Sequence, residues 1–143
     1  MRLRVLVLGL GFFVTAVAVA VAPHVAAGHT PDLSRPCTIV GTSGSDLLAG
    51  TPGPDVICGL GGNDMISAGD GNDLIIGEAG LDDIEGGLGD DTIFGGSDDD
   101  NLKGGRDDDH LWGGAGYDRL NGAQGHDTCS LDEDGGKATS CEA

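Results

Sequence analysis

The sequence predicts a solenoid built from nine-residue repeats, and three observations carry this prediction. From Gly41 to Ser130 the chain divides into ten units of nine residues with no insertion or deletion. The sixth place of every unit is aspartate, and the eighth place of every unit is apolar. Nine residues are too few to fold around a core of their own, so each unit must bury its apolar residue against its neighbours.

The aspartate and the apolar residue define two columns that run through the whole array. The sixth-place aspartates are Asp46, Asp55, Asp64, Asp73, Asp82, Asp91, Asp100, Asp109, Asp118 and Asp127. The eighth-place residues are Leu48, Ile57, Ile66, Ile75, Ile84, Ile93, Leu102, Leu111, Leu120 and Cys129. Ile39 falls at the eighth place of a degenerate unit before the array. Residues 28–40 are therefore expected to form an N-terminal cap segment.

The net charge disfavours one class of partner. All 24 acidic residues and five of the seven bases lie after residue 27, which gives that part of the chain a net charge of −19. Phosphate recognition needs a basic surface, so nucleic acid is disfavoured as a partner and a multivalent cation is favoured. Composition alone would equally suit an acidic disordered tail. The unbroken repeat decides against that alternative, because disorder gives no reason to keep a register.

Residues 1–27 have the character of a secretory signal peptide. Arg2 and Arg4 precede an apolar stretch from Val5 to Ala22, and small residues end the segment at Ala27, where cleavage is expected. An uncleaved membrane anchor is the competing interpretation, because 18 apolar residues reach the lower limit for a spanning helix. The signal peptide is favoured, since no basic stop-transfer residues follow the apolar stretch. The mature chain is expected to be secreted, with no membrane contact after cleavage.

The units resemble the glycine-aspartate nonapeptide of RTX, or haemolysin-type, calcium-binding repeats, most clearly in GLGGND, AGDGND, GGLGDD and GGAGYD. The resemblance covers residues 41–130. It implies an all-β fold, a right-handed parallel β-roll (a β-solenoid), in which six residues of a unit form a turn and three form a short strand. Two units make one coil, so ten units imply about five coils, with calcium ions between the turns of successive coils.

The residue types at the turn suit the ion that the resemblance implies. Calcium takes six to eight oxygen ligands at flexible angles, which carboxylates and backbone carbonyl groups supply. Glycine at the first, second and fourth places permits backbone angles that aim carbonyl groups at one point. Aspartates 18 residues apart would stack and repel one another without a cation. The expected calcium ligands are the ten sixth-place aspartates together with Gly59, Gly61, Gly69, Gly77, Gly86, Gly95, Gly104 and Gly113.

Some units depart from the pattern. Asp98 and Asp107 replace the fourth-place glycine in units seven and eight. Aspartate tolerates left-handed backbone angles better than most residues, so altered or weakened sites are expected there. Units one and two contain Thr42, Thr51 and two prolines, and they are expected to serve mainly as an N-terminal cap.

Four cysteines in a secreted chain imply two disulfides, for which three pairings are possible. Pairing of Cys37 with Cys58 and of Cys129 with Cys141 is favoured, because each pair lies at one end of the array. Residues 131–143 are then expected to form a C-terminal cap.

Residues at the seventh and ninth places should point away from the core. In even-numbered units these residues form an apolar outer face that includes Val56, Leu74, Ile76, Phe94 and Trp112. Such a face predicts a docking surface for a protein or surface partner. The alternatives are that residues 28–36 or 131–143 fold over it, or that its side chains merely pair with one another along the sheet.

The sequence thus predicts a secreted protein that binds several Ca²⁺ ions, folds when it binds them, and acts as a calcium-dependent binding or surface-adhesion module. One alternative is an extracellular calcium buffer or matrix component without a specific partner. Another is an accessory to an extracellular polysaccharide-active enzyme. No HExxH spacing is present and no Ser-His-Asp set can be argued, so the chain is not expected to be an enzyme.

Overall fold

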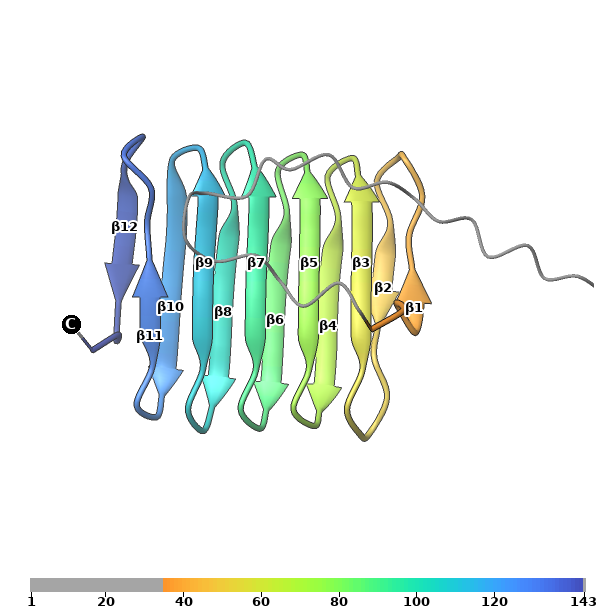
Figure 1. Ribbon diagram of the computed structural model, residues 1–143, viewed down its shortest axis with the longest axis horizontal. Helices are drawn as coiled ribbons and strands as arrows, with labels where there is room; N and C mark the ends of the chain where they lie inside the picture. The colour runs from red at the N-terminus through yellow and green to blue at the C-terminus, as the bar shows by residue number, and fades with distance from the viewer. Residues whose placement is uncertain (1–34, 143) are drawn as a thin grey trace, which may run out of the picture.

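The polypeptide forms a β-solenoid of about six turns, made of two parallel sheets (Figure 1). The computed structural model describes residues 35–142, and every regular element in that range is a strand. Sheet A contains β1 (Ile39–Val40), β3 (Val56–Gly61), β5 (Leu74–Ala79), β7 (Thr92–Ser97), β9 (His110–Ala115) and β11 (Thr128–Ser130). Sheet B contains β2 (Leu47–Ala49), β4 (Met65–Asp70), β6 (Asp83–Leu88), β8 (Asn101–Arg106), β10 (Asp118–Gln124) and β12 (Gly136–Thr139).

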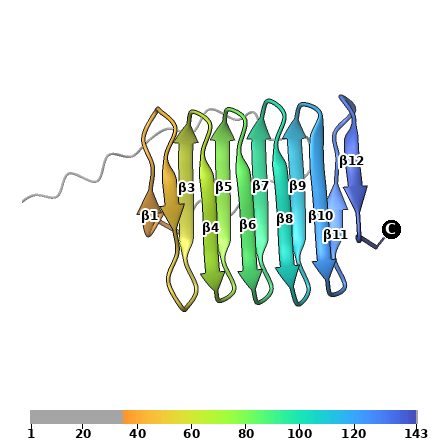
Figure 2. The same ribbon diagram turned by 180° about the vertical axis from the view of Figure 1, so that it is seen from behind.

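Neighbouring strands of each sheet pair at a constant offset of 18 residues. Ile57 of β3 pairs with Ile75 of β5, and Ile66 of β4 pairs with Ile84 of β6. Strands that follow one another along the chain lie in opposite sheets and point in opposite directions (Figures 1 and 2). Two repeats therefore make one coil, as the resemblance implied.

The coil beyond the expected five comes from the flanking segments. Ile39 of β1 pairs with Ile57, so the degenerate unit before the array joins the stack. Ala138 of β12 pairs with Leu120, so residues 131–139 continue the same register as a further degenerate unit. Sequence reasoning missed this last unit, although Ala138 stands nine residues after the last eighth-place residue.

The core is the eighth-place column. Its members from Ile57 to Leu120 are at most 2% exposed and form one cluster between the sheets. Ile39, Leu48 and Cys129 continue the column at its ends and are partly buried. Burying one such aliphatic side chain contributes about 2 kcal/mol, so the column provides the apolar contribution to stability along the whole stack.

The strands are longer than the resemblance implied. A strand such as β4 covers the last three places of one unit and the first three of the next. Leu60 pairs with Glu78 and Gly61 with Ala79, so backbone after the first place also joins the ladder. The expectation of three-residue strands is therefore wrong, and the turn between strands is confined to the fourth to sixth places.

Both ends of the solenoid carry a disulfide. Cys37 is bonded to Cys58, and Cys129 is bonded to Cys141, which confirms the favoured pairing. Residues 35–142 contain no helix with the length and apolar character needed to cross a membrane. Residues 1–27, where the signal peptide is expected, lie outside the described residues.

The outer side of sheet A carries the apolar side chains of the even-numbered units. Phe94 and Trp112 stack there with ring centroids 4.7 Å apart. Val56, Leu74, Ile76 and Phe94 are at most 8% exposed. Their position on the outer face is confirmed, but these four do not form the exposed surface that a docking role requires. Cys37, Leu60 and Trp112 pack against this cluster.

Candidate metal centre

The sixth-place aspartates lie at the ends of the turns, one residue before a strand begins or, for Asp118, at the first residue of β10. Asp82 precedes β6 and Asp91 precedes β7. Because the strands of the two sheets run in opposite directions, odd-numbered units place their aspartates along one edge of the solenoid and even-numbered units along the other (Figure 1). From Asp55 to Asp127 these side chains are at most 5% exposed. Each edge therefore holds a buried column of carboxylates at the strand spacing of about 4.8 Å.

One oxygen of each carboxylate ties successive coils together. The backbone N–H of Asp64 donates to Oδ1 of Asp82 at 2.8 Å, and that of Asp82 donates to Oδ1 of Asp100 at 2.9 Å. The same bond recurs throughout both columns, up to Asp118 on one edge and Asp127 on the other. These bonds fix the orientation of each carboxylate.

The second oxygen of these carboxylates has no such donor. Oδ2 is buried without a hydrogen-bond partner in Asp64, Asp73, Asp82, Asp91, Asp100, Asp109, Asp118 and Asp127. Leaving one buried polar atom unsatisfied costs about 1 to 3 kcal/mol, and more for a charged group. The repetition of this cost along both edges indicates that a cation belongs beside these oxygens.

Because the first place of the repeat is glycine, the backbone passes close to these oxygens and leaves beside them only a narrow space, called the gap below, that is too small for a Cβ atom. A Cβ atom on Gly59 would lie 2.5 Å from Oδ2 of Asp64 and 2.8 Å from the carbonyl oxygen of Gly77 in the next coil. A carboxylate oxygen and a carbonyl oxygen therefore face the same space. The equivalent carboxylate contact occurs at Gly41, Gly77, Gly86, Gly95, Gly104, Gly113 and Gly122. Two units differ: Ala68 stands at the first place of unit four, and the nearest atoms at Gly50 of unit two are backbone atoms of Ala68.

Two of the predicted glycine ligands lie away from these gaps. A Cβ atom on Gly61 would approach the carbonyl oxygen of Ala79 at 3.8 Å, and one on Gly69 would approach that of Thr51 at 3.3 Å. Neither position is within 4 Å of a sixth-place carboxylate. Gly122 is missing from the predicted set although it occupies a first place beside Asp127. The period itself is the signal that would have identified it.

Glycine has a different role at the second and fourth places, where the backbone takes positive φ. Second-place residues from Leu60 to Ala123 all have this conformation. At the fourth place, Asp98 and Asp107 adopt φ of 79° and 74°, as expected from the tolerance of aspartate for this region. First-place glycines do not have positive φ. Glycine therefore permits positive φ at the second and fourth places, and at the first place it permits a close approach between the backbone and the carboxylate.

Burial raises the pKa of the central aspartates. Desolvation is the main cause, with neighbouring carboxylates adding to it, and it raises the pKa of Asp82 to about 6, of Asp91 to about 7 and of Asp100 to about 8. The backbone hydrogen bond to each carboxylate opposes the rise. Hydrogen bonds from Thr51 instead hold the pKa of Asp55 below its usual value. A cation beside the carboxylates whose pKa is raised would favour their ionised form.

The donor atoms at these gaps suit a hard cation. Within residues 35–142 no three side chains of His, Cys, Asp or Glu come together as a metal-binding group. A site at the turns must therefore combine carboxylate oxygens with backbone carbonyl oxygens. Such an oxygen-only set fits calcium, whereas zinc and copper favour nitrogen or sulfur ligands.

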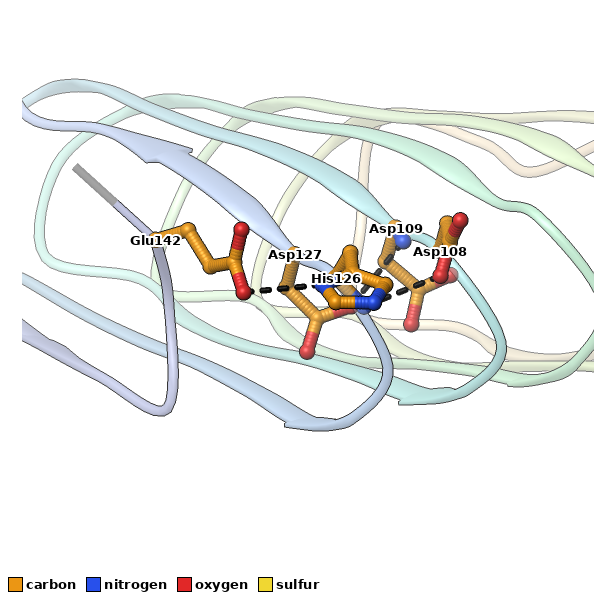
Figure 3. A network of polar contacts seen from close by, with 5 residues as sticks. All are labelled: Asp108, Asp109, His126, Asp127 and Glu142. Atoms are coloured by element: carbon orange, nitrogen blue, oxygen red, sulfur yellow. Dashed lines mark hydrogen bonds and ion pairs between the residues drawn. The ribbon is translucent and has the colours of Figure 1, made fainter.

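A polar network at the C-terminal end joins the tail to the last turns (Figure 3). Nδ1 of His126 lies 2.8 Å from Oε1 of Glu142, and the backbone N–H of His126 donates to Oδ1 of Asp108. In the same network, the N–H of Asp109 donates to Oδ1 of Asp127. The hydrogen bond to Glu142 raises the pKa of His126. Both side chains of the His126–Glu142 pair are exposed, so the contact fastens the tail at the surface.

Comparison with known proteins agrees with the repeat and its geometry. The family model of the RTX calcium-binding nonapeptide repeat (4 copies) matches residues 40–75, 58–93 and 94–129, which together span more than half of the chain. The chain belongs to this family. The comparison with curated proteins found no match.

As an RTX repeat protein, the chain is a calcium-binding protein with a structural β-roll. Calcium supplies the positive charge that the stacked carboxylates lack. Oδ2 of a sixth-place aspartate and the carbonyl oxygen of a first-place residue in the next coil are the groups that would hold it. Gly61 and Gly69 stay predicted ligands, through their backbone carbonyl groups.

Proposed function

We propose that this is a secreted calcium-binding repeat protein that folds on binding several Ca²⁺ ions and acts as a calcium-dependent binding or surface-adhesion module. The observation that carries the proposal is the row of buried, unpartnered Oδ2 atoms from Asp64 to Asp127. Without a cation, each edge of the folded roll holds a stack of desolvated like charges. With calcium between the coils, the same carboxylates become ligands.

Calcium binding and folding are one event in this proposal. Each ion would bridge groups of successive coils that are 13 residues apart in the sequence, such as the carboxylate of Asp64 and the carbonyl of Gly77. These groups come together only when adjacent coils are stacked, so the unfolded chain offers no equivalent site. A ligand that binds only the folded state stabilises that state.

Far-ultraviolet circular dichroism of the oxidised chain during a calcium titration tests this coupling. A cooperative gain of β signal is expected with calcium and not with magnesium, which requires closer octahedral coordination and dehydrates reluctantly. The calcium-free chain should show little β signal. A full β signal in chelator, or none at any calcium concentration, contradicts the proposal.

The two disulfides support secretion, because such bonds persist in oxidising compartments. N-terminal sequencing of the exported protein tests the cleavage expected after Ala27. Retention of residues 1–27 in the exported form would instead favour the membrane-anchor interpretation.

The adhesion role is separable from calcium binding alone. Purified protein is incubated with the surface of the secreting cells in calcium and in chelator, and the bound fraction is measured. Calcium-dependent retention is expected for a binding module. Loss of retention on Trp112→Glu would place the contact on sheet A. Equal, negligible retention in both conditions favours a calcium buffer or matrix component. The absence of catalytic activity also remains part of this proposal.

A further inference from the structure

The first two repeats satisfy their carboxylates with protein donors. In unit one, the backbone N–H of Thr42 donates to Oδ2 of Asp46 at 2.6 Å, and the hydroxyl group of Thr42 donates to the same atom at 2.9 Å. In unit two, Thr51 makes the same pair of bonds to Oδ2 of Asp55, at 2.7 Å and 2.9 Å. This is the oxygen that has no partner from Asp64 onward.

The backbone explains why only these two units can do so. From unit three onward every second-place residue has positive φ, from Leu60 to Ala123. Thr42 and Thr51, at the second places of units one and two, do not have positive φ. The first two turns are therefore a different conformation, in which the second-place N–H and hydroxyl both reach the carboxylate. Threonine is strongly disfavoured at positive φ because it is β-branched, so the residue type and the turn conformation agree.

The same coil is closed covalently and by further hydrogen bonds. Cys37 is bonded to Cys58, which links the segment just before β1 to β3. The hydroxyl group of Thr38 donates to Oδ1 of Asp55 at 3.1 Å, and it accepts the N–H of Val56 at 2.9 Å. Both oxygens of Asp55 thus have donors within the chain. An ion beside Asp55 would have to displace bonds that are already made.

We propose that Thr42 and Thr51 take the place of calcium in the first coil, so that the calcium row begins at Asp64 and the N-terminal end of the roll is closed without an ion. The two threonines thereby determine which carboxylates bind metal. This inference rests on the proposed function and revises the expectation that Asp46 and Asp55 are ligands.

Paired substitutions in the full oxidised chain test the assignment. Asp46→Asn with Asp55→Asn removes one carboxylate from each edge in the first coil, and Asp82→Asn with Asp91→Asn does the same in the middle of the roll. Native mass spectrometry counts the calcium ions bound, and circular dichroism gives the calcium midpoint of folding. The first pair should leave the count unchanged and the midpoint within about twofold, whereas the second pair should lower the count and raise the midpoint.

Equal losses of bound ions from both pairs would overturn the inference while leaving the calcium function intact. An absence of calcium uptake by the unmodified chain would overturn both, and it is distinguishable because no variant would then differ in ion count.

A second pair of variants tests the threonines themselves. Thr42→Val with Thr51→Val removes both hydroxyl groups at nearly constant volume, and Thr42→Ser with Thr51→Ser keeps them. In saturating calcium, amide hydrogen exchange in residues 42–58 should be faster by about tenfold in the valine variant, because a hydrogen bond to a charged group is lost. The serine variant should resemble the unmodified chain. Equal exchange in the valine and serine variants would contradict the role of the hydroxyl groups.

Discussion

The substitution Gly95→Ala tests whether calcium occupies the gap at the first place of the repeat. A Cβ atom at Gly95 would lie 2.6 Å from the carbonyl oxygen of Gly113 and in contact with Oδ2 of Asp100. Gly95 does not have positive φ, so alanine brings no left-handed backbone strain. Ala68, fully buried at the equivalent place, shows that the roll accommodates a methyl group there. The variant should therefore fold but lose the ion beside Asp100.

The expected loss of stability has two parts. For site dissociation constants of about 10⁻⁴ to 10⁻³ M, one ion stabilises the fold by about 1.4 to 2.7 kcal/mol at roughly 10 mM calcium. Crowding of the Gly113 carbonyl by the new methyl group costs about 1 to 3 kcal/mol. The free energy of unfolding in calcium should therefore fall by about 2 to 6 kcal/mol in total.

Urea unfolding in saturating calcium measures this difference, and native mass spectrometry counts the ions. The matched control is Ala68→Gly, which removes the methyl group at the equivalent place of unit four and should not lower the number of bound ions. If Gly95→Ala binds as many ions as the unmodified protein with the same calcium midpoint, the gap is not the calcium site and the reasoning is wrong.

Three other predictions follow from the core, the turns and the buried carboxylates. In urea unfolding, Ile93→Ala should lower the free energy of unfolding of the calcium-loaded roll by about 2 to 5 kcal/mol. Substitution of the exposed Leu47 by alanine should change the same free energy by less than about 0.5 kcal/mol. Ala123→Gly should stabilise the roll by about 1 kcal/mol in the same assay, because alanine at φ 80° is strained. In the calcium-free roll, burial raises the carboxyl pKa values to about 6 at Asp82 and about 8 at Asp100. Above about pH 4 the unfolded chain releases protons that the folded roll still holds, so a rise in pH favours the unfolded chain. Circular dichroism in chelator should therefore show more β signal near pH 4 than near pH 8, and an increase with pH would contradict this sign.

The period of the sequence predicted the repeat and its core column, and the resemblance to the RTX nonapeptide implied the β-roll. An apolar residue every nine places defines the core column, and the same phase placed Ile39 correctly in the stack. Cysteine positions at the two ends of the array predicted both disulfides. The unit containing Ala138 was missed because Gly136 stands where the other units have aspartate. Without that carboxylate the remaining signal is one small apolar residue.

Details of the candidate site depend on distances between coils, which a period does not contain. The sequence could not show that Oδ1 is used by the next coil while Oδ2 stays unpartnered. It also could not show that first-place glycines such as Gly59 permit a close approach to a carboxylate, whereas second-place glycines such as Gly87 permit positive φ. Nor did the pattern distinguish a threonine that donates to its aspartate from one that merely replaces glycine. Side-chain direction and backbone conformation settle these points.

The constant 18-residue register makes the protein modular in whole coils. Removing residues 77–94 would leave every later residue in the same sheet and on the same edge. Removing only residues 77–85 would transfer every later residue to the opposite sheet, so the apolar outer face would continue on the other side. Change in chain length is therefore tolerated in steps of two repeats. Each added coil brings one carboxylate to each edge, so the capacity for calcium can grow with length while the end segments stay the same.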